Sequence, residues 1–171
     1  KKARGLCARS VAAPTNVTFD GGPQAVTIAD LDGDGKPEVA CTNAYYDGAS
    51  VGSRVSIFKN TSAAGSVSFV STVYYPTSDI FLRLDPADLD GDGKLDLIVG
   101  NVVLRNTSGA GGMSFSSQSI PFSDLVLGIA DLDGDGQTEI VFTYFIPRQE
   151  SLQENVGGFS KLVVYNKDGV A

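Results

Sequence analysis

The chain has 171 residues and a formal net charge of −7, with 20 Asp and Glu against 13 Lys and Arg, and it contains no histidine. That length suits a single domain of ordinary size. The shortage of basic residues argues against a nucleic-acid partner, because phosphates are bound by Lys and Arg. The absence of histidine removes the commonest base at neutral pH and the usual zinc ligand. No apolar run reaches the roughly 18 residues of a membrane span, so we predict no insertion into a membrane.

The first residues show no hydrophobic periodicity. Residues 1–12 are interpreted as an N-terminal tail, and residues 13–171 as a single domain. Within residues 13–24, the run from Asn16 to Phe19 favours a β-strand and is followed by turn-favouring residues. We predict a short strand here, equivalent to the outermost strand of the units that follow.

Residues 25–78 form the first predicted unit, which has four short β-strands. Runs of β-favouring residues between Gly, Asn and Pro turns predict these strands at residues 25–29, 39–42, 54–58 and 67–75. An acidic loop joins the first two strands. This loop is therefore predicted to be the tip of a hairpin.

The unit repeats twice along the chain. Residues 79–121 contain the second copy, and residues 122–171 contain a third copy that, by strand count, lacks its outer strand. A four-stranded unit of this size cannot bury both faces of its sheet alone, which is typical of a propeller blade. The chain is therefore predicted to be all-β, with three propeller-type repeats built on four antiparallel strands.

The same acidic loop occurs at the same place in every unit. Each loop has carboxylates at positions 1, 3, 5 and 9 and glycines at positions 4 and 6. Such hard oxygen donors suit Ca²⁺, which takes about six to eight oxygen ligands. We therefore predict three Ca²⁺ sites, whose twelve carboxylates also account for most of the negative charge. They are Asp30, Asp32, Asp34, Glu38, Asp88, Asp90, Asp92, Asp96, Asp131, Asp133, Asp135 and Glu139.

Other interpretations of the acidic loops are less favoured. An EF-hand loop needs a bidentate Glu at position 12, where this chain has Cys41, Val99 and Phe142. A solvated acidic turn without metal would hold repelling carboxylates close together, and Mg²⁺ demands stricter octahedral geometry. A catalytic carboxylate pair needs differently tuned groups at one site, whereas three near-identical copies indicate a structural role. We identify no catalytic residues and predict that the chain is not an enzyme.

The loop pattern D-x-D-G-D-G-x-x-[DE] between two strands resembles the FG-GAP or VCBS repeat of integrin-α-like β-propellers. Ile28-Ala29 before the first loop and Glu38-Val39 at its end add to the likeness, which recurs around the third loop and covers roughly residues 13–171. The resemblance implies one Ca²⁺ in each loop, bound by the side chains at positions 1, 3, 5 and 9. It also implies a ligand from the backbone oxygen at position 7, which belongs to Lys36, Lys94 and Gln137.

In integrin-like propellers, the face opposite the metal loops commonly binds ligands. The resemblance therefore makes Tyr45, Tyr46, Asp47, Tyr144 and Arg148 a candidate ligand face. The alternative is that these aromatic residues pack against their own loops. The expected kind of ligand is a protein or a carbohydrate.

The number of repeats raises the question of how a ring is completed. Closed propellers have about four to eight blades, and three cannot easily close. The spare N-terminal strand and the missing outer strand of the third unit suggest pairing either with another copy of the chain or with a further part of a longer propeller. Mutual exchange predicts a six-bladed dimer, and head-to-tail donation that does not close predicts a filament.

Two kinds of covalent modification are candidates. Asn16, Asn60 and Asn106 each begin an N-x-[ST] glycosylation pattern, although such asparagines can equally be turn residues. Cys7 and Cys41 could form one disulfide in an oxidising compartment. The alternative for Cys41 is a small buried residue in a strand.

Together these features predict a secreted or cell-surface, calcium-binding module for adhesion, ligand binding or assembly, in which Ca²⁺ stabilises each repeat. Extracellular modules bind Ca²⁺ weakly, so the scarce calcium of the cytosol would leave such loops unfilled. Two alternatives stay open. One is a structural subunit that polymerises by strand donation into a filament or oligomer. The other is a non-catalytic propeller segment of a polysaccharide-active enzyme or a lectin.

Overall fold

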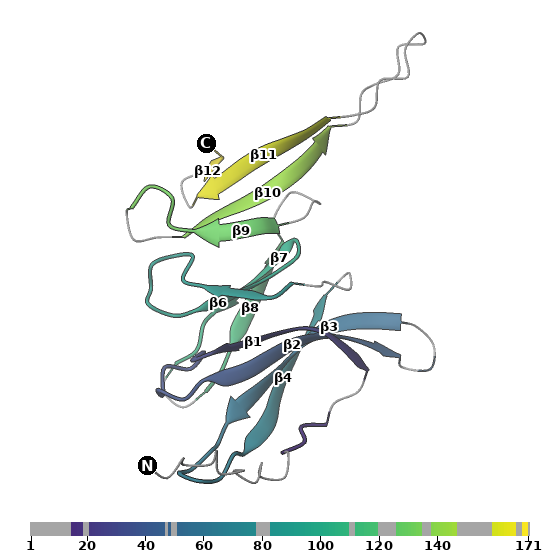
Figure 1. The fold of residues 1–171 in the computed structure, drawn as a ribbon, viewed down its shortest axis with the longest axis vertical. Coiled ribbons are helices and arrows are strands. Elements are labelled where there is room, and N and C mark those ends of the chain that lie inside the picture. The colour runs from purple at the N-terminus through teal and green to yellow at the C-terminus, as the bar shows by residue number, and fades with distance from the viewer. Residues whose placement is uncertain are drawn as a thin grey trace, which may run out of the picture.

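The computed structural model describes residues 15–18, 21–46, 48, 51–77, 83–109, 112–119, 126–134, 138–146, 159–166 and 169–170. In these residues the secondary structure is entirely β, and no helix is long and apolar enough to cross a membrane. The strands form three antiparallel sheets of four strands, and within each sheet neighbouring strands are consecutive in the chain. The three sheets form a stack, with the second sheet between the other two (Figure 1).

The first sheet contains the strands predicted for the first unit, each with somewhat different bounds. Its strands are β1 (Gly22–Ala29), β2 (Glu38–Tyr46), β3 (Val51–Asn60) and β4 (Phe69–Thr77). Ala29 at the end of β1 pairs with Glu38 at the start of β2, so the acidic loop is the tip of a hairpin, as predicted. The reason is local, because the apolar runs end at the first Asp and resume after the last acidic residue.

The second and third sheets repeat this strand order. The second sheet contains β5 (Asp85–Ala87), β6 (Asp96–Val99), β7 (Val102–Asn106) and β8 (Phe115–Ser119). The third contains β9 (Val126–Ala130), β10 (Glu139–Ile146), β11 (Phe159–Asn166) and β12 (Gly169–Val170). In each sheet, the acidic loop joins the first strand to the second.

The third sheet corrects the prediction that the third unit lacks its outer strand. The short strand β12 pairs with β11 through Tyr165 and Val170 and through Asn166 and Gly169. Asn, Asp and Gly between Tyr165 and Val170 favour a chain reversal, and the sequence prediction overlooked this signal. The outer edge of β11 is therefore paired within the chain at Tyr165 and Asn166.

The predicted N-terminal strand is also wrong over the residues that the structure describes. Residues 15–18 form no strand there, and Phe19 lies outside the described residues. Thr15 to Thr18 instead line a cavity of about 310 Å³ together with Phe58 and residues 67–69. Thr15, Asn16 and Thr18 are exposed, so the β-favouring composition of this run does not make it a strand here.

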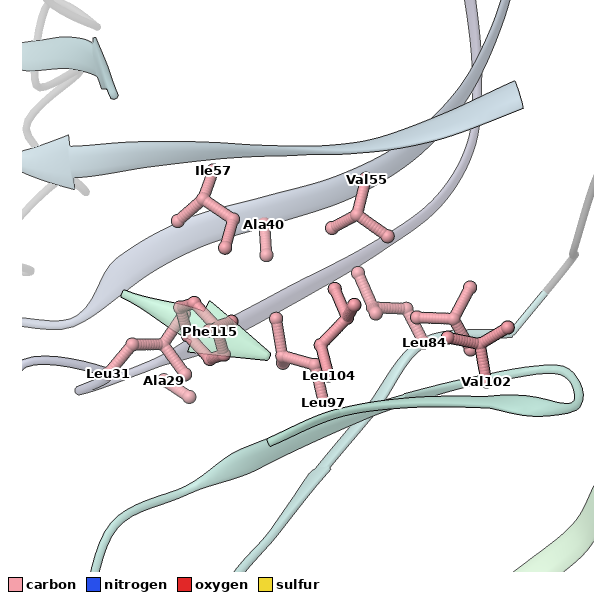
Figure 2. Packing of buried hydrophobic residues seen from close by; sticks show 11 residues of the cluster. Ala29, Leu31, Ala40, Val55, Ile57, Leu84, Leu97, Val102, Leu104 and Phe115 are labelled. Atoms are coloured by element: carbon pink, nitrogen blue, oxygen red, sulfur yellow. The ribbon is translucent and has the colours of Figure 1, made fainter. Parts of the chain in front are cut away.

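The larger hydrophobic core lies between the first and second sheets (Figure 2). Ala29, Leu31, Ala40, Val55 and Ile57 of the first sheet face Leu84, Leu97, Val99, Val102, Leu104 and Phe115 of the second. At one end of this core, the rings of Tyr75 and Phe115 meet edge to face with their centroids 5.6 Å apart. The Tyr75 hydroxyl also accepts a hydrogen bond of 2.9 Å from the Phe115 backbone N–H.

A second core joins the second sheet to the third. Ala87 and Ile98 pack with Ile140 and Phe142, and partly buried Leu89, Val103 and Ile129 lie against them. Strand β6 therefore has neighbours on both faces, and Leu97, Ile98 and Val99 are all buried. This explains its continuous apolar sequence, since a strand covered on both sides has no reason to alternate polar and apolar residues.

Candidate metal centres

The first acidic loop curls around its own carboxylates. Gly33 and Gly35 have φ angles of 75° and 84°, in the left-handed region that glycine adopts without strain. These turns direct the two backbone N–H groups at Asp30, whose Oδ1 accepts from Gly33 at 2.8 Å and Oδ2 from Gly35 at 2.9 Å. Asp32 and Asp34 each accept from the N–H two residues later, at 3.3 and 2.9 Å. The side chains at positions 1, 3 and 5 are thus held by the loop backbone.

The carboxylate at position 9 of the first loop is fully buried. Glu38 is 0 % exposed, and its two oxygens accept hydrogen bonds from the backbone N–H of Leu31 at 2.8 Å and of Asn60 at 3.3 Å. A buried carboxylate is costly unless donors or a cation compensate its charge. Glu38 therefore ties the start of the loop to the end of β3 and presents negative charge at the base of the loop.

The second loop repeats these hydrogen bonds. Asp88 accepts from Gly91 at 2.8 Å and from Gly93 at 2.9 Å. Asp90 accepts from the N–H of Asp92 at 3.1 Å, and Asp92 accepts from that of Lys94 at 2.9 Å. The bond from Lys94 is the main cause of a lowered pKa at Asp92. The two loops have the same hydrogen-bond pattern because they have the same glycines and aspartates at their tips.

Asp96 takes the place of Glu38 in the second loop. Its carboxylate accepts from Asn106 at 2.8 Å and from Leu89 at 3.2 Å. Burial raises the pKa of Asp96 above its ordinary value, and the two backbone hydrogen bonds oppose that rise. The nearby negative charges of Asp90 and Asp92 raise it further. A divalent cation in the loop would relieve both the burial of this charge and the repulsion.

The third loop shows the same features in its described part. Gly134, with a φ angle of 82°, donates to Asp131 at 2.7 Å, and Leu132 donates to the buried Glu139 at 2.7 Å. Asp135 and Gln137 lie outside the described residues. What is described of the third loop therefore matches the other two.

Each loop brings three of its predicted ligands together. Carboxylate oxygens lie within 4.8 Å of one another in three groups, namely Asp30, Asp32 and Glu38, then Asp88, Asp90 and Asp92, and finally Asp131, Asp133 and Glu139. Asp34 and Asp96 fall outside these groups. Several hard oxygens converging from one short loop fit Ca²⁺ better than zinc, which takes nitrogen and sulfur ligands more readily. The donor set thus fits the predicted ion.

Basic side chains at the ends of β3 and β7 point at the position-3 carboxylates. Lys59 forms an ion pair with Asp32, and Arg105 forms one with Asp90. Lys59 Nζ also lies 3.9 Å from Asp34, and its hydrogen bond to Asp32 is the main cause of its raised pKa. Neither residue is among those predicted from the sequence to form the site. Their signal was present, because Lys59 and Arg105 occupy the same place in their units, one residue before a repeated Asn.

The repeated asparagine forms a hydrogen bond to the backbone near the end of each of the first two loops. The side-chain amide of Asn60 donates to the Pro37 carbonyl at 2.9 Å, and that of Asn106 donates to the Leu95 carbonyl at 2.9 Å. Asn106 also donates to the carbonyl of Leu31, in the loop of the first sheet, at 2.7 Å. One asparagine therefore connects two neighbouring sheets.

This bonding bears on the predicted glycosylation sites. The amide nitrogen of Asn106 is the atom that a glycan would modify, and it is buried and makes two hydrogen bonds. The structure contradicts glycosylation at Asn106 and favours the alternative of a bonded turn residue, to which Asn60 also conforms. Asn16 is exposed, and its glycosylation stays a prediction.

The remaining candidate residues are only partly described. Tyr46 is exposed, and its hydroxyl donates to the Gly48 carbonyl at 3.0 Å. Tyr45 stacks on the Arg54 guanidinium, which lies 4.8 Å from the centre of its ring, in the neighbouring strand β3. Tyr144 is placed in β10, and Asp47 and Arg148 lie outside the described residues.

Of the two cysteines in the predicted disulfide, the structure describes only Cys41. Cys41 is buried in β2 with a free thiol, whose pKa is raised chiefly by burial. Cys7 lies outside the described residues. Cys41 is thus the small buried strand residue of the alternative interpretation.

Comparison with protein families matches the chain in two places. The FG-GAP repeat model matches residues 22–58, and the FG-GAP-like repeat model matches residues 44–99. Residues 22–99 of the chain therefore contain FG-GAP repeats. The matches contain the first two acidic loops, and since FG-GAP repeats form propeller blades, the sheets around those loops are blades of a propeller-type module. No curated protein and no solved structure matched the chain in the corresponding searches.

Proposed function

We propose that this FG-GAP repeat protein is an extracellular binding module whose blades are stabilised by Ca²⁺ and which carries out no chemistry of its own. The observation that supports this proposal is the repetition of one loop geometry, in which backbone N–H groups hold acidic side chains around a common point. FG-GAP repeats are typical of extracellular proteins, and propeller-type modules often serve adhesion or ligand binding.

The proposed role of calcium is mechanical. Each loop joins the first two strands of its sheet, and three of its carboxylates converge, at positions 1, 3 and 9 in the first and third loops and at positions 1, 3 and 5 in the second. A bound cation would cancel their repulsion and fix the hairpin tip. The backbone oxygens of Lys36, Lys94 and Gln137 are the further ligands that the family resemblance implies.

The size of this effect follows from the calcium concentration outside cells. Extracellular modules bind Ca²⁺ with dissociation constants near 10⁻⁴ to 10⁻³ M. With ~1 mM Ca²⁺ and a constant of ~0.1 mM, each site would stabilise the fold by about 1.4 kcal/mol, and three independent sites by about 4 kcal/mol. This is comparable to the whole stability of a marginal domain.

Chelation tests the proposal directly. We expect EDTA to lower the melting temperature, measured by circular dichroism, and ~1 mM Ca²⁺ to restore it. The free energy of unfolding should differ by about 4 kcal/mol between the two conditions. Native mass spectrometry should count up to three Ca²⁺ per chain, and the same concentration of Mg²⁺ is the control for a general ionic effect. An identical melting curve with and without EDTA would refute the metal proposal.

We propose a protein or a carbohydrate as the ligand of the module. The exposed Tyr46 at the end of β2 supports this choice, because it lies at the hairpin opposite the acidic loop and aromatic rings are common anchors in binding sites. The test is a comparison of wild type and Tyr46→Ala on arrays of glycans and extracellular proteins. Loss of binding with an unchanged melting curve would support the assignment, and unchanged binding would remove Tyr46 from the site.

A further inference from the structure

Asn106, the last residue of β7, connects the first two acidic loops through its side chain. Its amide nitrogen donates a hydrogen bond of 2.7 Å to the Leu31 carbonyl, at position 2 of the first loop, and one of 2.9 Å to the Leu95 carbonyl, at position 8 of the second. Its side-chain oxygen accepts from the Ser108 N–H at 3.0 Å. Asn106 is 2 % exposed, so these bonds are shielded from water. The side chain is therefore fixed in one orientation between the two loops.

On each side of this asparagine, the bonds continue to a buried carboxylate. In the first loop, the Leu31 N–H donates to Glu38 at position 9, at 2.8 Å. In the second loop, the backbone N–H of Asn106 donates to Asp96 at position 9, also at 2.8 Å. Leu31, Glu38 and Asp96 are each 2 % exposed or less. A series of buried hydrogen bonds, passing through Leu31 and Asn106, therefore joins the position-9 carboxylate of one loop to that of the next.

The side chain of Leu31 adds a second connection between the same two units. It lies in the larger core, which packs the first sheet against the second and includes Leu97 of β6 and Leu104 of β7 (Figure 2). Leu104 is two residues before Asn106 in the same strand. Close-packed interiors transmit a displacement instead of absorbing it. A shift of the first loop at position 2 is therefore passed on to the strand that supports the second loop.

Asn60, the equivalent asparagine of the first unit, shows which of these bonds a single loop needs. Its backbone N–H donates to Glu38 at 3.3 Å, its amide donates to the Pro37 carbonyl at 2.9 Å, and its side-chain oxygen accepts from Ser62 at 2.9 Å. Asn106 makes the same three bonds within its own unit, and its bond to the first loop is a fourth. Three bonds support the loop above Asn60, so the fourth bond of Asn106 serves to connect two loops.

We infer that the first two loops bind Ca²⁺ cooperatively and that Asn106 is the positioning residue that couples them, an inference that rests on the proposed calcium function. Occupation of the first loop fixes its backbone, including the Leu31 carbonyl. This carbonyl then holds the Asn106 amide, and the Asn106 N–H holds Asp96 at the base of the second loop. Part of the ordering cost of the second loop is thus met when the first is filled, which gives positive cooperativity. By linkage, filling the second loop favours the first by the same factor.

Calcium titration followed by nuclear magnetic resonance reads the two loops separately. The backbone N–H groups of Gly35 and Gly93 donate to the position-1 carboxylates of their own loops, so their amide signals report Ca²⁺ at each loop. Asp32→Asn removes a carboxylate from the first loop, and we expect it to raise the dissociation constant measured at Gly93 by about 5-fold, the lower end of typical couplings. Asp90→Asn should raise the constant measured at Gly35 by the same factor.

The two asparagines provide matched variants for the same titration. Asn106→Ala removes the bond to Leu31 and keeps the backbone N–H that holds Asp96. When Asn106→Ala is already present, Asp32→Asn should no longer change the constant measured at Gly93. Asn60→Ala is the control, because it removes an equivalent amide whose described bond stays within the first unit, and it should preserve the 5-fold effect. The comparison of wild type with Asp32→Asn needs no change at Asn106, so it decides the inference even if Asn106→Ala fails to fold.

The sign of the change at Gly93 separates this coupling from direct repulsion between two bound cations. An empty first loop is more negative than an occupied one, so repulsion alone would make Asp32→Asn tighten binding at the second loop. A lower or unchanged constant at Gly93 in Asp32→Asn would therefore overturn the coupling and leave the proposed calcium function intact. A 5-fold effect that persists in Asn106→Ala would overturn the role of Asn106. Glycine signals of the wild-type protein that do not move with Ca²⁺ would overturn both the coupling and the proposed calcium function.

Discussion

The first and second sheets have the same strand order, the same acidic loop and equivalent apolar positions, and they differ in what covers them. Among the described residues, the second sheet packs against another sheet on each side, whereas the first packs against another sheet on one side. Val26 and Leu84 make the difference plain, because each lies four residues before its acidic loop, yet Val26 is exposed and Leu84 is buried. The burial of a residue in this protein is therefore determined by the neighbouring sheet more than by its own strand.

The strongest way to test this comparison is to truncate both residues. Leu84→Ala should lower the free energy of unfolding by about 3 kcal/mol, because it removes buried methyl groups and leaves a cavity between two sheets. Val26→Ala should cost below about 0.5 kcal/mol in dilute solution, where its side chain faces water. Urea unfolding at ~1 μM measures both. Equal losses would mean that Val26 is covered even in the single chain.

A second test uses the asparagines under the loops. Asn106→Ala should destabilise the protein by about 2 kcal/mol, because it removes donors from two carbonyls and an acceptor from Ser108. Asn60→Ala should cost about 1 kcal/mol, since Asn60 bonds Pro37 and Ser62 within its own unit. Chemical denaturation of both variants gives the difference. If Asn60→Ala cost as much as Asn106→Ala, the bond to Leu31 would contribute nothing to stability.

The parts of the fold that sequence predicted well are local. Asp30 to Glu38 carry the loop, its glycines and the hairpin in nine consecutive residues. The errors concern contacts that local sequence does not contain. The run at residues 16–18 has strand composition but lines a pocket beside Phe58, and Asn106 has the glycan pattern but bonds a carbonyl in another sheet. Leu31 and Leu132 have nearly identical neighbours in sequence, but Leu31 is buried against the second sheet and Leu132 is exposed.

The smallest expected effect concerns the basic side chains beside the loops. Lys59 forms an ion pair with the carboxylate of Asp32 in the first loop, and Arg105 forms one with that of Asp90 in the second. An entering Ca²⁺ would have to compete with these side chains for the same oxygens, so we expect each of them to weaken calcium binding at its own loop. Lys59→Met keeps the apolar stem and removes the charge, and it should lower the calcium dissociation constant of the first loop by about 2- to 5-fold, the range of an exposed ion pair.

Calorimetric titration with Ca²⁺ measures this change, and Lys36→Met provides the matched control. Lys36 lies in the same loop, but its backbone oxygen is the expected ligand, so removal of its exposed ammonium group tests the general loss of one positive charge. A larger gain in affinity for Lys59→Met than for Lys36→Met would assign the effect to the ion pair with Asp32. Without calcium, Lys59→Met should melt at a lower temperature than Lys36→Met. The reason is that, in the absence of the metal, the ammonium group of Lys59 offsets the repulsion between the carboxylates of Asp32 and Asp34. Equal behaviour of the two variants in both conditions would show that Lys59 acts only through the net charge of the loop.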